Sequence, residues 1–122
     1  MKVLCYAPNN AVWRYTFPQA QWLEILKQRG DEIVYAYCDH DYESFCMSMA
    51  AFQVGVEAPA EKKQAVCRRC VANAHKVAQS FGFSAYSVNS FVTAEDRATA
   101  HRLARTARTR VRCPASSRDL PS

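Results

Sequence analysis

Lys2-Val-Leu-Cys-Tyr-Ala7 and Ile33-Val-Tyr-Ala-Tyr37 are the two stretches that decide the fold. Each is a short apolar run rich in β-branched or aromatic residues, which is typical of a strand buried in a parallel sheet. A helix is expected between them, from Thr16 to about Arg29, because Thr16 and Gln19 match a capping box. Strand, helix and strand in this order predict a right-handed βαβ unit with parallel strands.

Further elements are expected after this unit. The pattern predicts a short helix over 42–54, a long helix over 59–81 that ends at Gly82, and a weaker third strand over 84–88. We therefore expect an α/β fold: a Rossmann-like, three-layer domain over residues 1–97 with a short parallel sheet of about three strands and flanking helices. The first strand is expected in the middle of the sheet.

The formal net charge of +5 is concentrated at the end of the chain, where residues 95–122 hold seven arginines against three acids. Thr93 and Asp96 can begin a helix. From Ala98 onward, however, large aliphatic residues are few, so a helix there would have no apolar face to bury. We expect residues 98–122 to form a basic, largely disordered tail.

Four of the six cysteines lie between Cys38 and Cys70. Cys67 and Cys70 are three residues apart on the expected long helix, so their sulfurs share one helix face. Cys38 ends the second expected strand, and Cys46 follows it closely. Four thiolates are suitable ligands for structural zinc, with an iron-sulfur cluster as the alternative. The sequence therefore predicts a metal site formed by Cys38, Cys46, Cys67 and Cys70.

Two other interpretations of these cysteines stay open. Cys38 and Cys46 are also explained as ordinary buried apolar residues. A thioredoxin-like redox pair at Cys67 and Cys70 is disfavoured, because that chemistry places the pair at a helix N-terminus, where the dipole lowers the thiol pKa. No signal peptide or membrane-spanning stretch is visible in the sequence. We therefore expect a cytoplasmic protein, whose reduced thiols favour metal ligation over disulfides.

Four stretches carry a resemblance to a known family: Lys2-Val-Leu-Cys-Tyr-Ala-Pro-Asn9, Glu32-Ile-Val-Tyr-Ala-Tyr-Cys-Asp39, Cys46, and Cys67-Arg-Arg-Cys-Val-Ala-Asn-Ala74. Over residues 1–97 the chain resembles the amino-terminal half of a bacterial glycosyltransferase-like family linked to capsule or surface-polysaccharide biosynthesis. The resemblance implies two facing Rossmann-like domains. The amino-terminal domain would contact the sugar acceptor, and a carboxy-terminal domain, missing here, would hold the nucleotide-sugar donor.

Pro8-Asn9-Asn10 follows the first expected strand in place of a glycine-rich phosphate loop, so a bound dinucleotide is not indicated. Asn9, Asn10 and Trp13 lie beyond the carboxyl end of this strand, where open α/β sheets bind ligands. They are the candidate substrate-binding residues. No catalytic residue of the family is carried over to this sequence.

The leading interpretation is a fragment of such a protein: an acceptor-side domain with a structural metal site, incomplete as an enzyme when alone. A frameshift or gene fragment would explain why the α/β pattern stops before a donor domain and the apolar periodicity ends near Ala98. The alternative is a small metal-stabilised binding module whose basic tail, Arg97 to Arg112, contacts nucleic acid. Nucleic acid is disfavoured because no aromatic residue is interleaved with these arginines to stack on bases.

Overall fold

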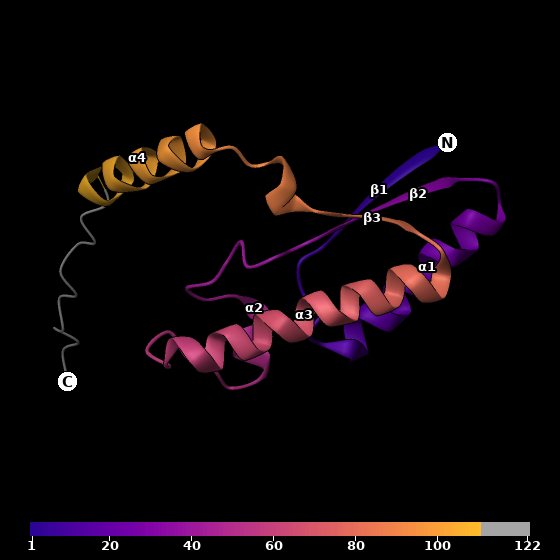
Figure 1. Ribbon diagram of the computed structural model, residues 1–122, viewed down its shortest axis with the longest axis horizontal. Helices are drawn as coiled ribbons and strands as arrows, with labels where there is room; N and C mark the ends of the chain where they lie inside the picture. The colour runs from indigo at the N-terminus through magenta and orange to yellow at the C-terminus, as the bar shows by residue number, and fades with distance from the viewer. Residues whose placement is uncertain (111–122) are drawn as a thin grey trace, which may run out of the picture. The chain divides into compact units, whose positions relative to one another are not determined.

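The computed structural model describes residues 1–110 (Figure 1). Its elements, in chain order, are β1 (Lys2–Ala7), α1 (Trp13–Gln28), β2 (Glu32–Tyr37), α2 (Met47–Ala51), α3 (Ala60–Phe81), β3 (Ser84–Ser87), the 3-10 helix η1 (Val88–Phe91) and α4 (Ala94–Arg110). The chain divides into two compact units, residues 1–91 and 92–122.

The strands form a three-stranded parallel sheet in the order β1-β2-β3. Lys2 pairs with Glu32 at the start of β1, and Val34 of β2 pairs with Ser84 of β3. The predicted α/β class, with a short parallel sheet and flanking helices, is confirmed. The predicted central position of the first strand is wrong. Both crossovers advance in the same direction across the sheet, so β2 lies in the middle and β1 at the edge.

α1 and α3 pack on the same face of the sheet. One core unites the inward-facing residues of the strands with residues of both helices, and it comprises Ala7, Ala20, Leu23, Ile33, Tyr35, Tyr37, Ala74, Val77 and Phe83. Strand side chains alternate between faces, and on the other face Leu4, Tyr6 and Tyr86 are exposed. Successive right-handed crossovers that advance in one direction leave their helices on one side. A second helical layer is therefore not formed within residues 1–91.

α1 begins earlier than the sequence predicted. Its first residue is Trp13, and Thr16 lies inside the helix with its hydroxyl donating to the Val12 carbonyl at 3.2 Å. The side-chain amide of Gln19 donates to the Cys5 sulfur at 3.1 Å. The expected capping box is therefore not formed, because the Thr16 hydroxyl bonds back one turn to Val12 and the Gln19 side chain bonds across to β1.

α3 has the expected bounds. It follows Pro59 and ends at Gly82, whose φ of 64° is the left-handed conformation that glycine adopts without steric cost. The third strand forms where it was expected, whereas the predicted helix over 42–54 is confined to α2. α3 and β3 therefore follow the local sequence signals, and α2 covers only part of its predicted range.

α4 is the described part of the second unit. The Thr93 backbone N–H donates to the Asp96 carboxylate at 2.8 Å, and the Asp96 N–H donates to the Thr93 hydroxyl at 3.1 Å. This is the predicted helix start. Leu103 is exposed, as expected for a helix without an apolar face to bury. The predicted tail over 98–122 is helical as far as Arg110, and its remaining residues lie outside the described part of the chain.

Among the helices of residues 1–110, none combines the length and the hydropathy that a membrane-spanning segment needs.

Candidate functional site

A pocket of about 270 Å³ lies at the carboxyl end of β1. Its lining residues come from the loop after β1 and from the segment that leads into α2: Pro8, Asn9, Tyr42, Phe45, Cys46 and Met47. Mostly apolar walls with a few polar groups are typical of small-molecule sites, and this edge of an open parallel sheet is where such sites occur. We call it the Asn9 pocket.

Asn9 is the one predicted substrate-binding residue that lines this pocket. Its backbone carbonyl accepts the Val12 N–H at 3.0 Å, which fixes the loop ahead of α1. Its side-chain amide can both donate and accept hydrogen bonds. Asn9 is thus held by its backbone at the pocket wall.

Asn10 is placed differently, because its side chain is buried. The amide nitrogen donates to the Ala7 carbonyl at 2.8 Å, and the amide oxygen accepts the Tyr35 hydroxyl. The Asn73 side chain donates to the Asn10 carbonyl at 2.7 Å. Asn10 therefore joins the loop to β2 and α3.

Trp13 also lies outside the Asn9 pocket. Its ring stacks on Phe17 at a centroid distance of 5.7 Å, and the Lys76 ammonium lies 5.7 Å from the ring centroid. These contacts connect the start of α1 with α3. The three residues grouped by the sequence are thus separated by the tertiary structure.

Two aromatic residues of the pocket, Tyr42 and Phe45, were not predicted from the sequence. Burial and a hydrogen bond with Tyr42 raise the pKa of Tyr6, which places the Tyr42 side chain against the end of β1. The sequence feature that could have indicated these pocket residues is the presence of two aromatic side chains in the polar segment between Cys38 and Cys46. Such a signal is weak, because single exposed aromatic residues are common.

A polar network at the ends of β2 and β3 was also missed. The Asp39 carboxylate contacts the His40 Nδ1 at 2.8 Å and accepts the Ser87 hydroxyl at 3.3 Å, and the Asn89 side chain donates to the Asp39 carbonyl. His40 has a φ of 64°, a backbone conformation uncommon for residues other than glycine. From the sequence alone, His40 is most simply a solvated polar residue, with substitution for a thiol ligand as the disfavoured alternative.

The thiols of Cys38, Cys46, Cys67 and Cys70, called here the thiol cluster, are all free. Cys67 and Cys70 are buried on one face of α3, as predicted. Burial, followed by the charges of the nearby Cys46, Cys38 and Cys70, raises the pKa of the Cys67 thiol to about 11. The structure thus places the other three thiols near Cys67, and Cys46 packs against the buried cluster that contains Cys67 and Cys70.

Cys70 makes two hydrogen bonds within this cluster. Its sulfur accepts the Ala11 N–H at 3.1 Å, and its thiol donates to the buried Ser48 hydroxyl at 3.6 Å. In residues 1–110, no three or more His, Cys, Asp or Glu side chains are arranged so that they could hold a metal ion. Metal binding would therefore require the thiols to move closer together.

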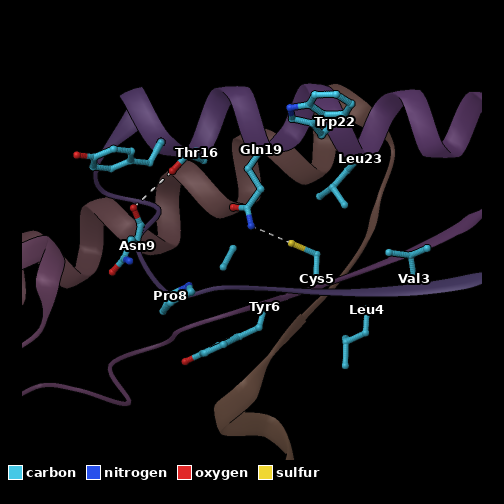
Figure 2. A pocket seen from close by; sticks show the side chains of 12 residues that line it. Val3, Leu4, Cys5, Tyr6, Pro8, Asn9, Thr16, Gln19, Trp22 and Leu23 are labelled. Carbon is cyan, nitrogen blue, oxygen red and sulfur yellow. Dashed lines mark hydrogen bonds between the residues drawn. The ribbon is translucent and has the colours of Figure 1, made fainter.

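A second, larger hollow of about 690 Å³ follows the free edge of β1 beneath α1 (Figure 2). Val3 and Cys5 point toward α1 in this view, whereas Leu4 and Tyr6 point to the opposite side of the strand. Gln19 and Trp22 of α1 lie above the strand. We call this hollow the β1 groove.

Comparison with known proteins found no matching family model, no matching curated protein and no matching solved structure.

Proposed function

We propose that residues 1–97 form the acceptor-side domain of a glycosyltransferase-like protein of surface-polysaccharide biosynthesis, and that the Asn9 pocket binds a sugar ring of the acceptor. The observation that carries this proposal is one amide and two aromatic rings gathered at the carboxyl end of β1. Pockets at this edge are the usual ligand sites of open α/β sheets.

The chemistry of the pocket suits a carbohydrate. The C–H bonds on one face of a sugar ring can pack against an aromatic side chain, and both Tyr42 and Phe45 are partly exposed to receive it. The Asn9 amide can donate to one hydroxyl group and accept from another. Because Cys46 also lines the pocket, the wall formed by residues 42–47 adjoins the thiol cluster.

Sugar transfer would need a second domain in this proposal. The resemblance assigns the nucleotide-sugar donor to a carboxy-terminal Rossmann-like domain. In residues 1–91 the loop after β1 is Pro8-Asn9-Asn10, without the glycines that let a backbone approach a pyrophosphate. The function proposed for this domain is therefore acceptor binding.

We further propose that the thiol cluster binds a structural zinc ion in the reducing cytoplasm. One support is that the four thiols are free and lie near one another. The other is that the Ala11 N–H already donates to the Cys70 sulfur, because such a bond also stabilises a thiolate. A bound zinc ion would supply a cross-link among its thiolate ligands. The segment 38–46 would have to close on α3, which would fix one wall of the Asn9 pocket.

Saccharide binding to the full chain tests the first proposal. Saturation-transfer difference NMR with a panel of simple hexoses, N-acetylhexosamines and uronic acids should detect binding, and Tyr42→Ala and Phe45→Ala should abolish it. Trp13→Ala is the matched control, because it removes an aromatic ring outside the pocket. Absence of binding to every saccharide, or an equal loss in the Trp13 variant, would overturn the proposed acceptor site.

A further inference from the structure

Within residues 1–110 no strand pairs with the outer edge of β1, so this edge presents a row of strand hydrogen-bonding positions without a strand partner. The Glu32 N–H donates to the Met1 carbonyl at 2.9 Å, so Met1 and every second residue after it direct their backbone groups toward β2. Lys2, Leu4 and Tyr6 consequently direct theirs toward the free edge. Such a row is a template for pairing with another strand.

β1 lacks the features by which edge strands usually avoid pairing. It has six residues without proline or glycine, and its one charged side chain, Lys2, lies 3.2 Å from Glu32 of the neighbouring strand. The opposite edge strand, β3, has only four residues and passes directly into η1. Short edge strands resist added pairing better than long ones. β1 is therefore the edge open to a partner.

The surface beside this edge is apolar. The exposed fraction is 70% for Leu4 on the strand and 68% for Trp22 on α1, and the β1 groove lies between α1 and the strand (Figure 2). Tyr15, at the start of α1, is exposed and lines the same groove. Exposed apolar side chains therefore lie on both sides of the strand at this edge, with Leu4 facing away from α1 and Trp22 on α1 itself, and exposed apolar surface marks interaction sites.

We propose that a second copy of this chain pairs with the β1 edge, with the strands antiparallel about a two-fold axis at Leu4. In this register Leu4 faces the partner's Leu4, Lys2 faces the partner's Tyr6, and Val3 faces the partner's Cys5. Directly opposite residues of antiparallel strands lie on the same face. The two sheets then join into one continuous sheet whose α1 helices lie on the same side.

The edge is complementary to itself, which is what a two-fold interface requires. The residues with outward backbone groups, Lys2, Leu4 and Tyr6, face one another, so their N–H and C=O groups pair across the axis. Lys2 faces an aromatic ring, and no like charges oppose each other. A second copy therefore satisfies this edge without any change in the backbone of β1.

The oligomeric state of the full chain tests the proposal. Sedimentation should give a dimer at micromolar concentration. Leu4→Lys places two like charges opposite each other on the axis and should raise the dimer Kd roughly tenfold or more. Tyr86→Lys is the matched control, because it adds the same charge to the same sheet face on β3 and should leave Kd unchanged. A monomeric chain, or equal weakening by both variants, overturns the proposal. Circular dichroism verifies that each variant is folded.

Cross-linking tests the register. Cα atoms of a hydrogen-bonded antiparallel pair lie about 5.5 Å apart, within the range of a disulfide. With oxidised glutathione as the electron acceptor, two Leu4→Cys thiols should form a symmetric disulfide and a covalent dimer that dithiothreitol reverses. Lys2→Cys should give no more covalent dimer than the wild-type chain, because Lys2 faces the partner's Tyr6. Cross-linking of Lys2→Cys in preference to Leu4→Cys, or of neither above wild type, would overturn the register.

Discussion

The Tyr35 hydroxyl donates a hydrogen bond to the Asn10 side-chain oxygen, and both residues are only 1% exposed. This bond ties the loop after β1 to the central strand. Since the same loop carries Asn9, it also sets one wall of the Asn9 pocket.

Asn10→Ala should destabilise the chain because it leaves the Tyr35 hydroxyl and the Ala7 carbonyl buried without this partner. A loss of about 2–4 kcal/mol in the free energy of unfolding is expected, from two lost hydrogen bonds. Asn9→Ala is the control and should change it by less than about 0.5 kcal/mol, as a surface substitution does. Urea unfolding measures both, and equal losses would contradict the structural role of Asn10.

Zinc content should depend on the thiol cluster. Chain purified without added metal should contain zinc, and Cys67→Ser should lower both the zinc content and the Tm, since structural zinc contributes folding free energy. Cys5→Ser is the control, because Cys5 lies in β1 and bonds to Gln19. If elemental analysis finds the full zinc content in the Cys67 variant, the zinc proposal is refuted. If it finds iron in the wild-type chain, the site holds an iron-sulfur cluster instead.

The start of α4 should be sensitive to acid. Hydrogen bonds from Thr93 hold the pKa of Asp96 below its usual value of 3.8. A carboxyl group whose pKa is lower when folded stabilises the fold above its unfolded pKa, and that stabilisation is lost as pH falls through the folded pKa. The Thr93 amide resonance should therefore titrate below pH 3.8. Titration at or above that value, or an identical profile in Asp96→Ala, would contradict the cap.

Removing residues 100–122 should leave the Tm of the remaining chain little changed. Within residues 1–110, the core beneath the sheet and the smaller buried cluster of Ala11, Met49, Val66, Cys67 and Cys70 both belong to the first unit. The helix that is removed exposes Leu103, so it takes little buried apolar surface with it. Differential scanning calorimetry of the two chains measures the effect, and a fall of many degrees would show that the second unit stabilises the first.

The chain alone should transfer no sugar, because the proposed site is for the acceptor. The assay measures the rate at which nucleoside diphosphate is released from UDP- and GDP-sugars in the presence of a saccharide that binds the Asn9 pocket. This rate should be the same with and without the protein. Measurable turnover would place a donor site in this chain and refute the assignment to the acceptor side.

The sequence by itself determined the elements whose signals are local. The apolar runs of β1 and β2, the periodicity of α3 and the stop at Gly82 all act within a few residues, and each predicts its element correctly. The same periodicity placed Cys67 and Cys70 on one helix face.

Only the tertiary structure decided which of these elements meet. The edge position of β1 depends on the direction in which the chain crosses the sheet, and no local pattern encodes that direction. The burial of Asn10 depends on Tyr35, and the Asn9 pocket depends on Tyr42 and Phe45, which lie far along the chain. Contacts between residues distant in sequence arise from packing, which is why adjacent asparagines with the same loop chemistry acquired different roles.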